Sequence, residues 1–157
     1  MTTAPQRFAS FTNRLYPRLT ASAGTEVAAM SPTGDLRALA SRKHCTVVSY
    51  RRSGEPVATP VWFGLADGRL YFRSLADAAK LRRIARRPDV LVAPCNFRGA
   101  VRGAPFAATA RILDGADEAI AEAAIEANYG IGRRLYRRLI AGAAAVYVEV
   151  SPAGSST

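Results

Sequence analysis

Short segments rich in β-branched and aromatic residues, each followed by a turn signal, constrain the fold of this chain more than any other feature. The clearest pair lies in GEPVATPVWFGLADGRLYF, residues 54–72, where strand-like segments at 57–64 and 69–74 flank a turn at Asp67 and Gly68. An Asp-Gly pair between two such segments is a strong hairpin signal. Pro60 and Trp62 lie inside the first segment, and a proline cannot donate a hydrogen bond to a neighbouring strand. Any fold assigned to the chain therefore has to explain this proline.

Further segments of both kinds surround the hairpin. The same strand-like pattern predicts strands over 45–50, 89–97, 105–113 and 145–150. Helical spacing predicts helices over 35–43, 75–87 and 117–130, the last continuing through 131–142. About six short strands, with one helix between the third and the fourth, predict a mainly β (α+β) fold. We expect an antiparallel barrel with peripheral helices, which leaves few strand edges exposed.

The two ends of the chain differ from this pattern. Apolar residues recur at helical spacing between Phe8 and Leu19, with arginines on other faces, which predicts a short amphipathic helix ended or kinked at Pro17. Residues 20–34 are predicted to be a linker. The predicted organisation is an N-terminal extension over 1–31, a barrel domain over 32–151 and a flexible tail over 152–157. The extension is expected to dock on the barrel or a partner, with weak membrane-surface contact as the alternative.

Composition excludes several classes of protein. With 157 residues and 49% hydrophobic residues, the chain is expected to form one globular domain. It contains no apolar segment of about 20 residues and no apolar run after Arg7, so we expect a cytoplasmic protein without a secretion signal. Cys45 and Cys95 lie among apolar residues and are predicted to be buried, reduced thiols. His44 is the only histidine, which disfavours a histidine metal site or a Ser-His-Asp triad.

The charge points to an anionic ligand. The formal net charge is +10, and almost all of the basic residues are arginines, which bind phosphates and carboxylates through two parallel hydrogen bonds. Lys80 is expected in the first turn of the helix over 75–87, where unpaired backbone N–H groups favour an anion. Ser74, at the end of the preceding strand, adds a hydroxyl group. These features predict a phosphate site, although no glycine-rich loop accompanies it.

A family resemblance joins these observations. The segments TPVWF (59–63) and LYF (70–72), followed by KLRRIARRPDVLVAPCNFRG (80–99), resemble the flavin/deazaflavin oxidoreductases. These are relatives of pyridoxamine 5'-phosphate oxidase with an FMN-binding-type split β-barrel. The likeness is greatest to the branch of probable coenzyme F420-dependent enzymes. It covers residues 36–150 and leaves the N-terminal segment unmatched.

The resemblance implies a cofactor site and a role for the proline. In such proteins the strand that contains Thr59, Pro60 and Val61 runs along the ring system of the cofactor, and the split in the barrel tolerates the proline. Trp62 would pack beside the ring or in the core. The remaining cofactor-binding positions that the resemblance implies are Ser74, Lys80, Arg83, Asn96 and Arg98. The last two would lie near the cofactor of the partner in a homodimer.

Charge suggests which cofactor binds. Coenzyme F420 carries a phosphodiester and an oligoglutamate tail, and a row of arginines suits it better than it suits FMN, which remains the alternative. The implied reaction is hydride transfer between the reduced deazaflavin and a small conjugated organic acceptor, with no catalytic side chain assigned. A non-catalytic cofactor-binding barrel and a nucleic-acid-binding barrel stay open as further alternatives. Nucleic acid is not the expected partner, because the aromatic residues alternate into the predicted core.

Overall fold

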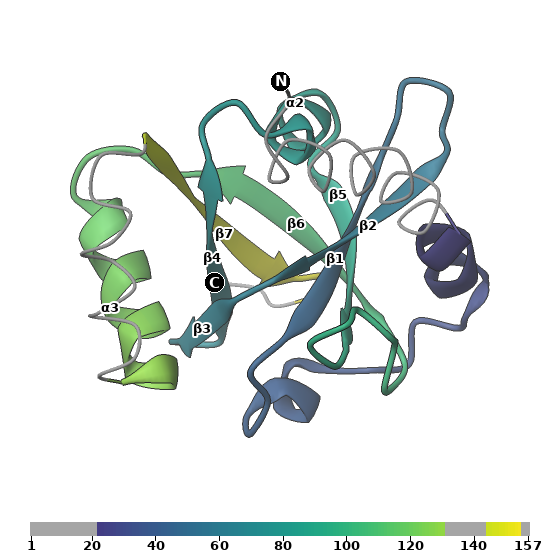
Figure 1. Cartoon of the computed structure of the whole chain (residues 1–157), viewed down its shortest axis with the longest axis horizontal. Helices are drawn as coiled ribbons and strands as arrows, with labels where there is room; N and C mark the ends of the chain where they lie inside the picture. Colours follow the sequence, from purple (N-terminus) through teal and green to yellow (C-terminus); the bar gives the residue numbers. More distant parts are fainter. Residues whose placement is uncertain (1–21, 131–143, 155–157) are drawn as a thin grey trace, which may run out of the picture.

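In the part of the chain that the structure describes, seven antiparallel strands form a single curled sheet in the order β2-β1-β5-β6-β7-β4-β3 (Figure 1). The structure is a computed structural model that describes residues 22–130 and 144–154. The strands are β1 (Cys45–Tyr50), β2 (Pro56–Val61), β3 (Phe63–Ala66), β4 (Arg69–Leu75), β5 (Asp89–Pro94), β6 (Phe106–Ile112) and β7 (Ala145–Pro152). The sheet curls into a split barrel, which confirms the predicted fold class.

The split lies at Trp62, and it explains why the structure has seven strands where the sequence predicts about six. The single strand predicted over 57–64 is wrong, because the chain leaves the sheet after β2 and re-enters it at the opposite edge as β3. β2 pairs with β1, and β3 pairs with β4. Among the strands that the structure describes, β2 and β3 therefore form the two sheet edges. A proline at position 60 is accommodated because its strand has a neighbour on one side only.

The helices match the prediction in place and differ from it in length. They are α2 (Ala79–Arg86), α3 (Asp117–Tyr129) and the 3-10 helix η1 (Leu36–Leu39). α2 starts later than the predicted residue 75, because Leu75 still pairs with Ala145 in β7. β7 also extends past the predicted residue 150, since Pro152 pairs with Ala108. The predicted helices over 8–19 and 131–142 lie outside the described residues.

The core fills the inside of the curled sheet, and α2 closes one end of it (top of Figure 1). Phe63 and Phe72 face each other across β3 and β4, and both are completely buried. From α2, Leu81 and Ile84 join the same cluster. An eight-residue helix is too short to be stable alone, so this burial is what holds α2 on the barrel.

α3 covers the outer face of β3 and β4, on the left in Figure 1. Its buried residues Ala121, Ala124 and Ile125 pack against Tyr71 of β4. Gly64 of β3 permits a very close approach, because a Cβ atom there would lie 2.2 Å from the backbone carbonyl of Ala124. The helix backbone therefore rests directly on the strand backbone.

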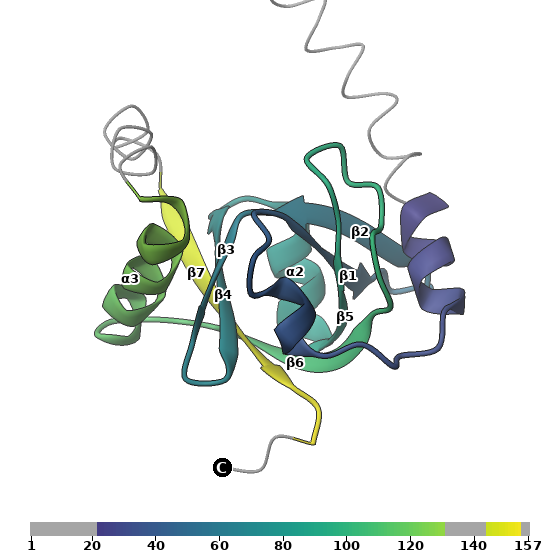
Figure 2. The same cartoon turned by 90° about the horizontal axis from the view of Figure 1, so that it is seen from below.

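A helix over residues 22–29 replaces part of the predicted linker, so that prediction is wrong. It packs on the outer face of the barrel (right in Figure 1 and in Figure 2), where Val27 is completely buried with Val48 and Ala58. Gly24 makes this contact possible, since a Cβ there would meet the Pro56 carbonyl oxygen at 2.4 Å. This segment is helical despite its many small residues, because the helix buries one apolar stripe against the barrel. No helix in the described parts of the chain is long and apolar enough to cross a membrane.

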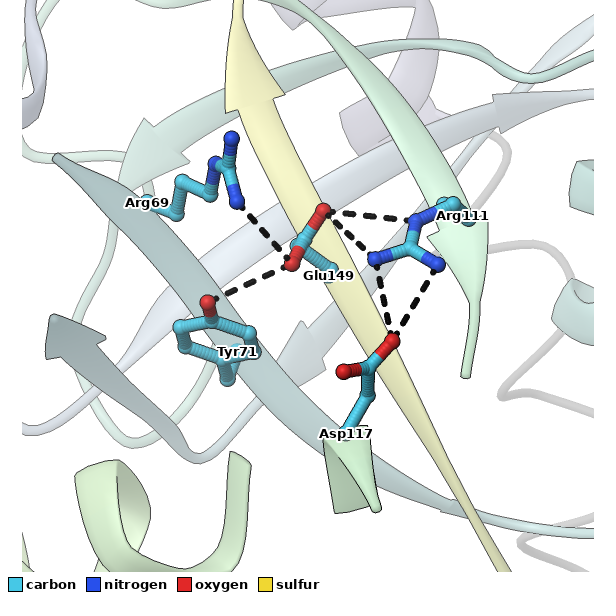
Figure 3. A network of polar contacts seen from close by, with 5 residues as sticks. All are labelled: Arg69, Tyr71, Arg111, Asp117 and Glu149. Carbon is cyan, nitrogen blue, oxygen red and sulfur yellow. Dashed lines mark hydrogen bonds and ion pairs between the residues drawn. The ribbon is translucent and has the colours of Figure 1, made fainter. Parts of the chain in front are cut away.

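A buried carboxylate ties β4, β6 and β7 together on the α3 side (Figure 3). Glu149 of β7 accepts hydrogen bonds from Arg111 at 3.2 Å and from the Tyr71 hydroxyl at 3.3 Å. Arg69 pairs with the same carboxylate at 3.6 Å, and Arg111 also reaches Asp117 at the start of α3 at 3.5 Å. Glu149 is only 7% exposed, so two arginines and a hydroxyl compensate for its removal from water. We assign this network to the stability of the fold.

Both cysteines are buried free thiols, as predicted. Burial raises the pKa of Cys95 from 9.0 to about 11, an effect that the nearby Arg42 partly opposes. Burial also raises the pKa of Cys45 well above its ordinary value, and the neighbouring Cys95 adds to this. The folded state therefore favours the neutral thiols.

We expect the free energy of unfolding to fall as the pH rises from 9 towards 11. A folded-state pKa above the unfolded value stabilises the fold fully below pH 9, and this contribution is lost as the pH rises through about 11. For Cys95 alone the loss by pH 10.5 should be about 2 kcal/mol. Urea denaturation of the wild type and of Cys95→Ala at pH 8 and pH 10.5 measures it. An equally steep fall in Cys95→Ala would contradict the assignment.

Candidate cofactor-binding site

The first turn of α2 presents a lysine that has no partner among the described residues. Lys80 is half-buried, and within the described residues its ammonium group makes no hydrogen bond or ion pair. Burial lowers the pKa of Lys80, and the charge of Arg83 lowers it further. The helix N-cap, Ala78, supplies no side-chain hydrogen bond to this turn, and its carbonyl accepts the Leu81 N–H at 3.1 Å, so among the described residues the N–H groups of Ala79 and Lys80 stay free. An anion here would meet a cation and unpaired backbone donors together.

Arg83 lies one turn further along α2 and anchors the helix to β1. Its Nε atom donates a hydrogen bond to the Ser49 hydroxyl at 2.8 Å. Burial lowers the pKa of Arg83, and the charges of Arg51, Arg82 and Arg86 lower it further. Such mutual repulsion is relieved when an anion binds among the cations, so this part of the surface is prepared for one.

Three contacts, a hydrogen bond, a cation–π contact and an ion pair, order the cations around Arg83. Arg86 donates a hydrogen bond to the Tyr50 carbonyl at 2.9 Å, and the guanidinium of Arg87 lies 3.9 Å from the centre of the Tyr50 ring. Arg51 forms an ion pair with Glu55 at 3.5 Å, in which both side chains are about half exposed. Exposed pairs of this kind contribute little, so Arg51 can exchange Glu55 for another anion.

Ser74, near the end of the strand before α2, uses its proton locally. It is buried at the end of β4 on the inner side of the sheet, the same side as Phe72. Its hydroxyl donates to the Leu75 carbonyl at 3.1 Å. The hydroxyl can bind a phosphate only by rotating away from that carbonyl.

The edge strand β2 places the predicted ring-binding residues on alternate faces. Thr59 and Val61 point to the inner face, where Val61 belongs to the core cluster, and Pro60 points outward opposite Thr46. Thr59 and Pro60 are half-buried. Along the whole of β2 the edge away from β1 has no strand partner in the described structure. Its backbone donors and acceptors can therefore meet a planar ring edge-on.

Trp62 lies outside the core, at the turning point between β2 and β3. Its side chain is 41% exposed. The indole stacks on Tyr129 of α3, with ring centres 5.0 Å apart and planes 21° apart, and meets the edge of His44 at 6.5 Å. Of the two places expected for Trp62, the structure therefore excludes the core.

The loop after β5 carries the two remaining predicted residues. The Asn96 side chain accepts hydrogen bonds from the backbone N–H groups of Arg98 at 3.0 Å and Ala100 at 2.9 Å, so it shapes the loop. The Arg98 guanidinium lies over the ring of Phe97, which is 71% exposed. A Cβ atom on Gly99 would lie 2.9 Å from the Pro60 ring, which places this loop against β2.

The predicted residues thus form two groups at opposite ends of β2. Arg83 contacts Ser49, which pairs with Val57, whereas Trp62 directly follows Val61. At a strand rise of about 3.3 Å per residue, the two groups are separated by about 13 Å. A ligand with a phosphate at one end and a planar ring at the other could span them.

Sequence reasoning missed Ser49, Tyr50, Arg51, His44 and Tyr129. Ser49 and Tyr50 belong to a strand that resembles any other, and only the packing of α2 gives them cationic neighbours. Tyr129 ends a helix far along the chain, and no local pattern could pair it with Trp62. Arg51 alone had a signal, because RRSGEP places two arginines in the turn before β2.

The curled, split sheet with its open edge strand places the protein in the class of small split-barrel proteins. Residues 33–150 match the family model of pyridoxamine 5'-phosphate oxidase. The chain therefore belongs to the pyridoxamine 5'-phosphate oxidase family, which confirms the resemblance at the level of the family. No curated protein matches the chain.

Solved structures agree on the fold. A conserved hypothetical protein of Mycobacterium tuberculosis has a TM-score of 0.56 at 18% identity, covering 74% of this chain and 76% of that one. The heme storage protein HutZ of Vibrio cholerae has a TM-score of 0.56 at 14% identity, and the match covers 71% of this chain and 82% of that one. A pyridoxamine 5'-phosphate oxidase-related, FMN-binding protein of Nostoc punctiforme has a TM-score of 0.50 at 15% identity, and the match covers 74% of this chain and 73% of that one. Identities this low relate the folds alone.

Proposed function

We propose that this protein binds coenzyme F420 and transfers a hydride between the reduced coenzyme and a small conjugated organic acceptor. The observation that carries the proposal is the cationic end of the site. There Lys80 has no partner among the described residues, and Arg83 lies among further arginines. The family supports a cofactor-binding barrel, and the charge supports the choice of coenzyme.

The residues present fit a phosphate group. Lys80, Arg83 and the free N–H groups of the first turn of α2 would hold it, because these donors lie within one turn of each other along the helix. The unpaired edge of β2 would hold the pyrimidine side of the ring through backbone groups of Thr59 to Val61. Trp62 would cover the ring from the β2–β3 turn.

The choice between F420 and FMN depends on charge beyond one phosphate. FMN carries a single phosphate, for which Lys80 and Arg83 suffice. Arg51, Arg82 and Arg86 each lower the pKa of Arg83, so they lie near it in a cluster of positive charge. An oligoglutamate tail would neutralise more of this cluster than the single phosphate of FMN would.

The chain's own residues hold and orient the reactants in this proposal. When bound, the deazaflavin supplies the hydride chemistry. We assign no general acid or base. The only histidine, His44, is engaged with Trp62, and the buried carboxylate Glu149 is engaged with arginines on the α3 side of the sheet.

A fluorescence titration with oxidised F420 and, separately, with FMN at low and high salt tests the proposal. We expect F420 to bind more tightly than FMN and to lose more affinity as the salt concentration rises, because more charge pairs are involved. Reduction of a conjugated acceptor by reduced F420 is then measured with the same protein. Tighter binding of FMN would overturn the choice of coenzyme in favour of an FMN protein, as in the Nostoc relative. Binding of neither would overturn the proposed function.

A further inference from the structure

The C-terminal end of α3 is fastened to the turning point between β2 and β3. The Tyr129 hydroxyl accepts a hydrogen bond from the Phe63 N–H at 3.0 Å and donates one to the Lys43 carbonyl. The neighbouring Asn128 amide donates to the Phe63 carbonyl at 2.8 Å and to the Arg42 carbonyl at 3.3 Å. Both backbone polar groups of Phe63, the residue after Trp62, are therefore held by α3.

The same helix end also fixes the plane of the indole. Tyr129 stacks on Trp62 with an angle of 21° between the planes. Tyr129 itself has little freedom, because its hydroxyl is bonded at two points and the Lys43 ammonium lies 5.6 Å from the centre of its ring. Lys43 is in turn held by the Asn128 side chain at 3.2 Å. Because the Tyr129 ring is immobilised in this way, it can hold the stacked Trp62 indole in one orientation.

We infer that Tyr129 is a positioning residue that sets the orientation of Trp62, and with it the aromatic wall that a planar conjugated ring contacts. This inference rests on the proposed function for the identity of the ring. α3 would then do more than cover the outer face of the sheet, because its last turn would determine how well the ring end of the site is formed. Preorganisation of this kind raises affinity, since the indole does not have to be ordered when the ligand binds.

Three variants separate positioning from simple support of the fold. Tyr129→Leu removes the stacked ring and the hydroxyl, whereas Tyr129→Phe removes the hydroxyl alone. Ile125→Val loosens the packing of α3 four residues earlier, at a fully buried position that belongs to the Tyr71 cluster. It serves as the control for a general weakening of the helix.

Two readouts are needed for each variant. Trp62 is the only tryptophan, so acrylamide quenching of intrinsic fluorescence reports its exposure in the free protein. Fluorescence titrations give the dissociation constants of F420 and FMN. We expect Tyr129→Leu to increase the quenching and to weaken binding of the preferred cofactor by about 2- to 13-fold, the range that one aromatic pair contributes. Tyr129→Phe should change both less, and Ile125→Val should change neither.

The inference is overturned if Tyr129→Leu leaves the quenching unchanged, or if the quenching rises while cofactor affinity stays at the wild-type value. Equal effects in Ile125→Val would also overturn it, because they would show that loosening α3 anywhere is sufficient. If the wild type binds neither F420 nor FMN, the proposed function fails and the role of Tyr129 towards a cofactor fails with it. The quenching data would then still decide whether Tyr129 orients Trp62.

Discussion

Replacing Gly64 with valine should lower the free energy of unfolding by about 3 kcal/mol, at the upper end of the usual cost of overpacking. The added Cβ would lie 2.2 Å from the Ala124 carbonyl carbon and oxygen, and both are helix backbone atoms that no rotamer change can move. Valine is favoured in strands, so the local backbone preference does not add to this cost, which comes from the clash with α3. α3 has to shift away from β3, and its contacts with Tyr71 weaken with it.

Ala107→Val is the matched control for Gly64→Val. It enlarges an exposed position on another strand, β6, and should change stability by less than about 0.5 kcal/mol. Urea denaturation followed by circular dichroism compares the two variants. Because Tyr129 ends α3, Gly64→Val should also shift the fluorescence of Trp62. Equal stability of the two variants would show that α3 does not rest on the backbone of β3.

Replacing Lys80 with alanine should weaken F420 binding by about 1–3 kcal/mol, or roughly 5- to 150-fold, as expected for a lost charge-assisted contact. Arg37→Ala is the matched control, because it removes one positive charge from an exposed position of η1. Titrations of both variants with F420 measure the difference. Equal affinities would remove Lys80 from the phosphate site.

Lys80→Met adds a result that a purely structural role would not give. The lowered pKa means that the folded protein disfavours the charged ammonium relative to the unfolded chain. Methionine keeps the apolar stem and removes the charge. The free protein should therefore become more stable in urea while its affinity for F420 falls. A loss of both stability and affinity would instead indicate that Lys80 supports the fold.

The comparison of Ser74 with Lys80 shows how far local sequence reaches into the site. The pattern of a strand end followed by a helix start placed both residues next to each other, because each signal is local to about ten residues. The same local signals could not predict whether either side chain makes a hydrogen bond in the folded protein. Ser74 uses its proton on Leu75, whereas Lys80 is left without a partner among the described residues, and packing determines both outcomes.

Two segments, one before β1 and one after it, show the same limit for the fold. The sequence indicated a strand over 57–64 and a linker over 20–34, since strand propensity is continuous through Trp62 and small residues dominate before Pro32. The structure divides the strand at Trp62 and folds 22–29 into a helix. In both places long-range burial outweighs local preference. Phe63 joins the core beside Phe72, and Val27 packs onto Val48 and Ala58.

Local patterns in the sequence were sufficient to predict the antiparallel β architecture, the order of the main helices and strands, and the buried thiols. They also predicted a helix that contains Lys80, but they placed its start at residue 75, which pairs with β7 instead. Each follows from periodicity, turn chemistry or charge within a short window. The tertiary structure alone decided which residues meet across the sheet. It brought Arg83 to Ser49, the loop at Gly99 to Pro60, and Tyr129 to Trp62. The physical reason is that these contacts join residues far apart in the chain, and their energies depend on the curvature of the sheet and on the packing of α2 and α3.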